Sequence, residues 1–135
     1  MASRSKQDLN EILVDAYDKA CAEYLLQYPN LPQPFITCTY RSKDEQNVLF
    51  EQGRSVKGSK VTNAKGGESP HNYNKSAAFD IAFVGLNKKL DWSKGNFRKF
   101  ADIIVKIQPL VVCGIDFKSL PDAPHFELKD WRKYV

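Results

Sequence analysis

Apolar side chains recur every three or four residues in three separate parts of the chain, which is the spacing of one face of an α-helix. The first part runs from about residue 5 to residue 28 and stops at the proline-rich segment YPNLPQP. The second, SKDEQNVLFEQG, opens on a serine with a glutamate three residues later, as in a capping box, and ends at a glycine. The third is LDWSKGNFRKFADIIVKIQP. This pattern predicts three helices.

Short β-branched or apolar runs lie between these helices and predict strands. They are FITCTY, AAFDIAFVG, LVVCGI and HFEL. Residues 54–76 are rich in Gly, Ser, Asn and Lys, so we expect a long loop there, with room for a short strand near Val61. A loop of this length in a small domain is more often functional than idle. We predict the α+β class, with a small, mostly antiparallel sheet flanked by about three helices.

Composition and charge add little to the predicted fold and exclude few classes of function. The 135 residues fit one domain, and 42% apolar with 27% charged residues is ordinary for a globular protein. The net charge of +4 could favour an anionic partner, either nucleic acid or an acidic polymer of the cell envelope, but does not choose between them. Because few aromatic residues accompany the loop lysines, we rank nucleic acid low and predict that it is not a partner.

The cysteines and the N-terminal segment bear on where the chain works. Cys21, Cys38 and Cys113 are odd in number and widely spaced, so we predict core thiols and neither a disulfide framework nor a metal knuckle. The segment MASRSKQDLNEIL has no long apolar run, so we expect no signal peptide and no stable membrane insertion. If the protein acts outside the membrane, another factor must let it out.

The segment SPHNYNKSAAFD raises a question about chemistry, because a carboxylate lies inside an apolar run. Side chains alternate faces along a strand, so Phe79, Ile81 and Phe83 form the core face. Asp80 therefore lies on the opposite face, between two alanines that leave space above it. This arrangement suggests that something approaches the carboxylate.

The two histidines of the chain lie in similar surroundings, each beside a loop and close to a strand. Two imidazoles and a carboxylate from His71, His125 and Asp80 would make the three-ligand set of a catalytic zinc site, with Asp122 near enough to act as general base. The residues alone leave other readings open. The histidines could be structural, Asp80 could bind loop amides, and Asp122 could be a turn residue.

The motifs that carry these residues resemble the zinc peptidases of bacterial cell-wall peptides. These are the D-alanyl-D-alanine carboxypeptidases and the phage L-alanyl-D-glutamate endopeptidases, which have a hedgehog-like peptidase fold. The shared features are SPH at residues 69–71, AFD at residues 78–80 and DAPH at residues 122–125. The upstream YRS, the helix with Glu-Gln and the following Gly-Arg are similar to the phage endolysins. The resemblance covers about residues 35–128, which would be the catalytic core, with residues 1–34 as N-terminal helix and linker of the same domain.

The resemblance implies one Zn²⁺ per chain, with His71, Asp80 and His125 as ligands and Asp122 as catalytic base. It also implies that Arg41 meets the substrate. Gln46 would support Arg41, and Ser69 would hydrogen-bond near the metal or shape the loop. Asp80 follows His71 by nine residues, two more than the commonest family spacing. We expect the extra residues to lengthen the connecting loop and to leave the strand register intact.

The function implied is hydrolysis of peptidoglycan stem peptides by a monomer, with a phage endolysin that cleaves L-alanyl-D-glutamate as the favoured assignment. Such an enzyme is made in the host cytoplasm and reaches the cell wall after holin-type release. One alternative is a D-alanyl-D-alanine carboxypeptidase on the same scaffold. Another is a non-catalytic wall-binding module of a phage particle.

Overall fold

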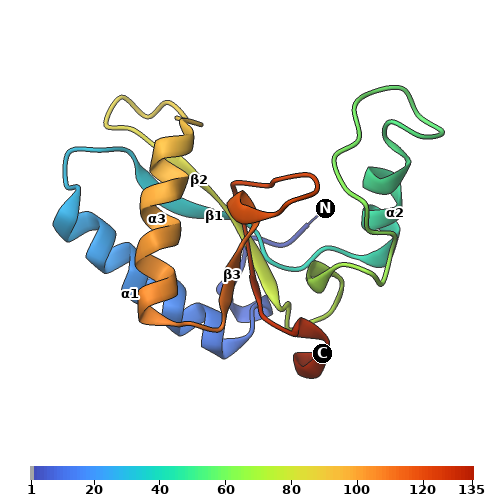
Figure 1. Ribbon diagram of the computed structural model, residues 1–135, viewed down its shortest axis with the longest axis horizontal. Coiled ribbons are helices and arrows are strands. Elements are labelled where there is room, and N and C mark those ends of the chain that lie inside the picture. The colour runs from blue at the N-terminus through green and yellow to red at the C-terminus, as the bar shows by residue number, and fades with distance from the viewer. Residues whose placement is uncertain (1) are drawn as a thin grey trace.

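The computed structural model describes residues 2–135, which form three α-helices, four strands and short 3₁₀ turns (Figure 1). The predicted class and antiparallel sheet are confirmed. The helices are α1 (Glu11–Gln27), α2 (Lys43–Glu51) and α3 (Lys94–Ile107). The strands are β1 (Gln33–Cys38), β2 (Ala78–Val84), β3 (Val111–Cys113) and β4 (His125–Leu128). The 3₁₀ turns are η1 (Lys6–Asp8), η2 (Pro70–Asn72), η3 (Gly114–Asp116) and η4 (Trp131–Tyr134).

The four strands form one sheet in the order β1-β2-β4-β3, and every neighbouring pair is antiparallel. Strand β2 is central, and its residue Asp80 pairs with Cys38 of β1 and with His125 of β4. An irregularity between Ile36 and Cys38 shifts the register of β1 by one residue. Because directly opposed residues place their side chains on the same face, Cys38, Asp80 and His125 form a row across the sheet.

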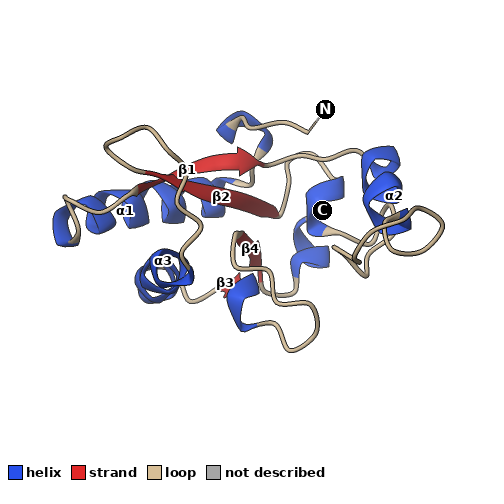
Figure 2. Ribbon diagram, turned by 90° about the horizontal axis from the view of Figure 1, so that it is seen from above, coloured by secondary structure: helices blue, strands red, loops and turns tan. Residues whose placement is uncertain are grey.

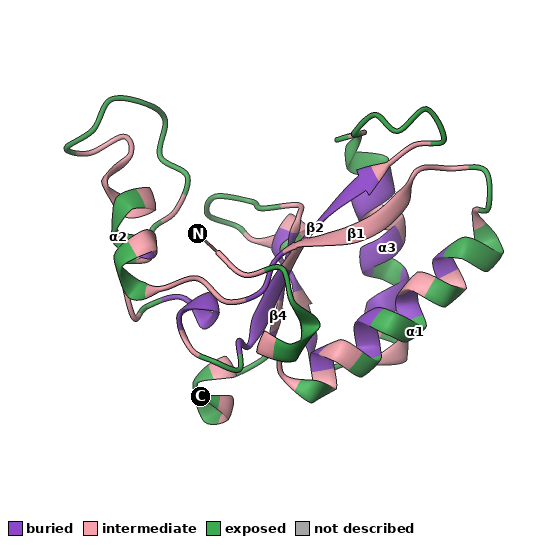
Figure 3. Cartoon of the chain, turned by 180° about the vertical axis from the view of Figure 1, so that it is seen from behind, coloured by how far each residue is buried: buried purple, intermediate pink, exposed green. Residues whose placement is uncertain are grey.

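Helices α1 and α3 cover one face of the sheet and enclose the hydrophobic core (Figure 3). The core is rich in aromatic side chains, and Phe83 of β2 packs edge-on against Phe97 of α3 at a centroid distance of 4.9 Å. Phe79 stacks on Phe126 of β4 at 5.2 Å and meets Tyr17 of α1 at 5.5 Å. The predicted alternation along β2 is confirmed, since Phe79, Ile81 and Phe83 are fully buried in this core.

Helix α2 and the long loop after it lie on the other side of the sheet from α1 and α3 (Figure 2). The predicted capping box is present, because Glu45 N–H donates to the Ser42 hydroxyl and Ser42 N–H donates to the Glu45 carboxylate. The loop is fastened to α2 by side-chain contacts to its backbone, including one from Gln46 to the carbonyl of Ala64 at 2.9 Å. This face therefore holds the polar residues that the core face excludes.

Two details differ from the sequence prediction. The first helix begins at Glu11 because Asn10 caps it, and the preceding residues form η1. Leu9 makes an isolated bridge to Ser76, which separates η1 from α1. Within the described residues no strand forms near Val61, where the backbone is irregular. A search of residues 2–135 also finds no helix with the length and apolar character needed to cross a bilayer.

Candidate metal centre

His71 reaches the open face of the sheet from the turn η2. The Ser69 hydroxyl accepts a hydrogen bond from His71 N–H at 3.2 Å, and the Asn72 side chain accepts one from Ser69 N–H, so the two residues cap this turn reciprocally. Ser69 thus shapes the loop that carries His71. The longer spacing to Asp80 is taken up by residues 73–77, and β2 still starts at Ala78. Within this strand Asp80 pairs directly with His125, so the longer spacing does not prevent the two side chains from sharing a face.

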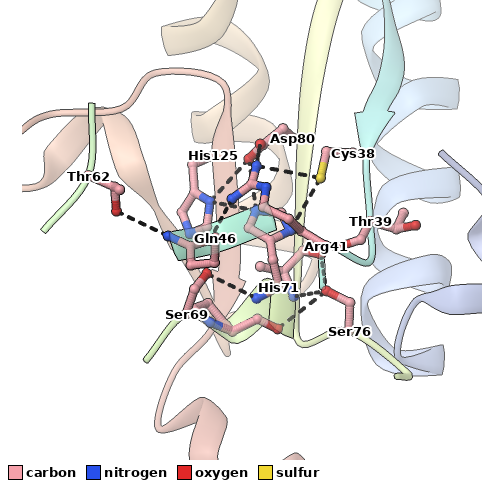
Figure 4. A network of polar contacts seen from close by, with 12 residues as sticks. Cys38, Thr39, Arg41, Gln46, Thr62, Ser69, His71, Ser76, Asp80 and His125 are labelled. Atoms are coloured by element: carbon pink, nitrogen blue, oxygen red, sulfur yellow. Dashed lines mark hydrogen bonds and ion pairs between the residues drawn. The ribbon is translucent and has the colours of Figure 1, made fainter. Parts of the chain in front are cut away.

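Three potential ligand atoms meet in a nearly regular triangle above β2 and β4 (Figure 4). His71 Nε2 lies 3.2 Å from Asp80 Oδ1 and 3.2 Å from His125 Nδ1. The third side, from His125 Nδ1 to Asp80 Oδ1, measures 3.1 Å. Metal–ligand bonds near 2.0 Å in a tetrahedral arrangement place ligand atoms about 3.3 Å apart. The triangle therefore has the size and the donor types of a three-ligand metal site with one open position.

A further contact orients each imidazole toward this triangle. His71 donates its Nδ1 hydrogen to the backbone carbonyl of Thr39 at 2.7 Å, which leaves Nε2 free as a ligand. His125 donates its Nε2 hydrogen to Glu127 Oε1 at 2.7 Å, which leaves Nδ1 free. Such partners fix the tautomer and ring orientation of metal-binding histidines and increase their basicity. The two histidines thus take opposite neutral tautomers, and the lone pairs of His71 Nε2 and His125 Nδ1 point to the same place.

The three side chains of the triangle shift one another's pKa values. When both histidines are protonated, His71 Nε2 and His125 Nδ1 donate to Asp80 instead of offering lone pairs to a metal. Burial by itself would raise the pKa of Asp80, but the charge of His71 and these hydrogen bonds outweigh it and lower that pKa. Burial would lower the pKa of His71 and of His125, yet the interactions with Asp80, joined at His125 by the hydrogen bond to Glu127, outweigh burial and raise both. With only 18% of its side chain exposed, Asp80 is an ionised group that needs positive partners. A divalent cation would supply that charge, so the three residues fit a metal.

Arg41 lies beside the triangle on the segment between β1 and α2. Its Nη2 is 3.6 Å from Asp80 Oδ2, and its Nη1 donates to Gln46 Oε1 at 3.0 Å. Gln46 is buried and is itself anchored to the Ala64 carbonyl at 2.9 Å, so the long loop indirectly fixes the guanidinium. A fixed cation in this position can bind a carbonyl oxygen or a carboxylate that approaches the metal site.

Asp122 lies at the exposed rim of the site, on the turn that leads into β4. One oxygen of Asp122 lies within 4.8 Å of the ligand atoms of Asp80 and His125. The cleft walls partly desolvate this carboxylate and raise its pKa, and the negative charge of Asp80 adds to the rise. The turn packs against Gly114, where a Cβ atom would collide with the Asp122 carbonyl oxygen and lie 2.9 Å from His125 Cβ. Gly114 is therefore needed for this turn to lie where it does.

A cleft of about 700 Å³ opens over the triangle. One wall comes from α2 and the loop after it, and the other from residues 117–122, with Asn63 Nδ2 and Ser119 Oγ 3.3 Å apart across it. The turn η4 contributes Trp131 and Arg132 to its lining. All seven candidate residues line this cleft: Arg41, Gln46, Ser69, His71, Asp80, Asp122 and His125.

The sequence prediction missed two side chains in this site. Cys38 is not an inert core thiol, because its Sγ lies 3.7 Å from His71 Nδ1 and 3.6 Å from Arg41 Nη2. Its place depends on the register between β1 and β2, which has no local signal. Glu127 also escaped notice, although the spacing His125-Phe126-Glu127 on a strand already places the first and third residues on one face.

Comparison with known proteins finds a characterised sequence relative of this chain. Over 100 residues, 69% of the chain, the sequence is 36% identical to the peptidoglycan L-alanyl-D-glutamate endopeptidase CwlK of Bacillus subtilis (strain 168). The match covers 59% of CwlK, so the chain spans about three fifths of that relative's length. No protein-family model matches the chain.

Solved structures show the same fold. The L-Ala D-Glu endopeptidase ChiX of Serratia marcescens superposes with a TM-score of 0.71 at 20% identity, covering 99% of this chain and 92% of that one. The LD-carboxypeptidase LdcB superposes with a TM-score of 0.65 at 19% identity, covering 98% and 66%. The chain thus shares the fold of these two peptidases and carries a His-Asp-His triangle on it. In sequence, the chain is similar to an L-alanyl-D-glutamate endopeptidase, which supports the resemblance of its motifs to that family.

Proposed function

We propose that the protein is a zinc-dependent peptidase that cleaves the L-alanyl-D-glutamate bond of peptidoglycan stem peptides. The observation that carries the proposal is the triangle of His71, Asp80 and His125, whose sides of 3.1–3.2 Å suit one zinc ion per chain. The 36% identity to an endopeptidase with this specificity supports the choice of bond.

The residues around the triangle account for the chemistry. Zinc, when bound, supplies a Lewis acid that lowers the pKa of water and polarises a carbonyl group. Asp122 accepts the proton of the water molecule whose oxygen attacks the alanyl carbonyl carbon. It then gives this proton to the amide nitrogen as the C–N bond breaks, and the second proton of the water passes from the new alanyl carboxyl group to the released amine, which leaves a carboxylate and an ammonium group. Arg41, held by Gln46, stabilises the negative charge that develops on the carbonyl oxygen.

The role of Asp122 separates an enzyme from a binding module that keeps only the fold. Asp122→Ala should retain about one zinc per chain and lose at least a hundredfold in turnover, because general base catalysis contributes about 10²–10⁴-fold. Asp116→Ala is a matched control, since Asp116 is an exposed carboxylate paired with Arg98 outside the cleft. Unchanged lysis of cell walls by the Asp122 variant would overturn the assigned role.

We infer a phage lysis enzyme from the resemblance of the segment around Arg41 and Gln46 to phage endolysins. The protein then acts on the wall as a monomer after holin-type release. Expression in a bacterial host should leave cells intact until a holin is co-expressed, after which they should lyse. Lysis at the same rate without the holin would contradict this route. Sedimentation of the zinc-loaded protein tests the monomer.

A further inference from the structure

Arg132 is a cation in the cleft wall that the proposed reaction does not use. Among the described residues that line the cleft, Arg41 and Arg132 are the arginines, and no lysine joins them. Arg41 is already engaged by Gln46 and Asp80. Arg132 is on η4, which follows directly after the strand that carries His125. Its position is therefore tied to the strand that holds the site.

An aromatic side chain supports one face of this guanidinium. The Arg132 guanidinium lies over the ring of Trp131, 4.4 Å from its centre. Trp131 in turn packs against Tyr73, with ring centres 6.0 Å apart, and Lys43 caps the Tyr73 ring at 5.3 Å. Stacking on an aromatic face leaves the planar edge of a guanidinium, with its N–H donors, free to bind other groups.

The two carboxylates that precede Arg132 most closely in the sequence have other partners. Glu127 accepts from His125 at 2.7 Å, and Asp130 lies 3.9 Å from the ammonium group of Lys133. Within residues 2–135, no carboxylate lies within ion-pair distance of Arg132. A guanidinium presents paired N–H donors that match a carboxylate. The cleft thus holds a guanidinium, stacked on an aromatic ring, that no carboxylate among the described residues neutralises.

We propose that Arg132 is a specificity-determining residue that binds a free carboxylate of the substrate; this rests on the function proposed above. An L-alanyl-D-glutamate bond uses the nitrogen of glutamate, so one glutamyl carboxyl group continues the peptide and the other stays free. The carboxyl terminus of the peptide is a second source of the same chemistry. Either group meets Arg132 when the peptide lies along the cleft.

The test compares acid and amide forms of one substrate. Three peptides contain the L-alanyl-D-glutamate bond: one with both carboxylates free, one with the glutamyl carboxylate replaced by a carboxamide, and one with the terminal carboxylate so replaced. We expect the zinc-loaded wild-type protein to lose about fivefold in kcat/KM, mostly through KM, on one of the two amides. The amide that suffers the loss identifies the carboxylate.

Variants decide whether Arg132 causes this preference. Arg132→Gln should cleave the acid and the amide at similar rates, and Arg132→Lys should recover part of the preference because the charge is kept and the planar fork is lost. Lys133→Gln is the matched control, since it removes one charge from the same turn but not from the cleft lining, and it should behave as wild type.

Two sets of results would overturn the inference. It fails if wild type cleaves all three peptides equally, if Arg132→Gln keeps the full preference, or if Lys133→Gln loses it to the same degree. If the wild type cleaves none of the three peptides and also leaves the L-alanyl-D-glutamate bond of intact peptidoglycan uncut, the proposed function is overturned and the inference with it. The two failures are thus distinguishable.

Discussion

Replacing Glu127 should weaken zinc binding although Glu127 is not one of the proposed ligands. Its Oε1 accepts the Nε2 hydrogen of His125 at 2.7 Å, and the two side chains are only 17% and 8% exposed. The contact keeps the His125 lone pair on Nδ1, directed at Asp80 and His71. Without it, the ring could rotate or take the other tautomer, and the zinc site would lose a preformed ligand.

The magnitude follows from the geometry. A short hydrogen bond to a charged group with little solvent access is worth about 1.5–3 kcal/mol. Since about 1.4 kcal/mol is tenfold in an equilibrium constant, losing the bond corresponds to about 10–100-fold in zinc affinity. Glu127→Gln keeps an oxygen acceptor and removes only the charge, so we expect about tenfold. Glu127→Leu removes the acceptor as well, and we expect about a hundredfold.

A competition titration against a chromophoric zinc chelator measures these affinities directly. Glu68→Gln is the matched control, because Glu68 also lines the cleft but hydrogen-bonds the backbone of Lys65, not a histidine. The control should bind zinc as tightly as wild type. Affinity of Glu127→Leu within twofold of wild type, or an equal loss in Glu68→Gln, would refute the orienting role.

The remaining predictions concern the other supports of the site. Gly114→Ala should displace the turn before His125, which should lower activity in a peptide hydrolysis assay and lower the free energy of unfolding, measured by calorimetry, by about 1–3 kcal/mol. Normal values for both would contradict the close packing at Gly114. Gln46→Leu should lower kcat/KM about tenfold and leave zinc affinity unchanged, because it removes the acceptor that holds Arg41; an unchanged rate would count against that link. Zinc at a hundredfold excess over its dissociation constant should raise the unfolding temperature by on the order of 10 °C; His71→Ala should abolish the shift, and an equal shift in that variant would place zinc elsewhere.

Local sequence patterns were sufficient to predict the helices and strands and the face of β2 on which Asp80 lies. The alternation of large and small residues along β2 placed Asp80 opposite the core, and the serine–glutamate pair located the start of α2. Both signals arise from neighbours in sequence, so they survive without knowledge of the fold. The start of α1 was missed although Asn10, a residue type favoured at the N-cap, marks it; the bridge that separates η1 from α1 joins Leu9 and Ser76, which are far apart in the chain.

The rest of the site depends on contacts between distant segments. Cys38 joins the row with Asp80 and His125 only because the irregularity near the end of β1 shifts its register. The Thr39 carbonyl orients His71 from 32 residues away, and no side-chain pattern marks a backbone acceptor. Gly114 fits against Asp122 and His125 through packing alone. By contrast, the place of Glu127 could have been predicted from the alternation of side chains along a strand, because it shares a face with His125.

The most direct test of a zinc peptidase specific for L-alanyl-D-glutamate is mass spectrometry of purified peptidoglycan digested by the zinc-loaded protein. The account predicts new peptides with a free D-glutamate amino group and new chains ending in an L-alanine carboxylate. Both should disappear with a chelator and return on addition of zinc. Release of terminal D-alanine alone would contradict the account and favour the carboxypeptidase alternative.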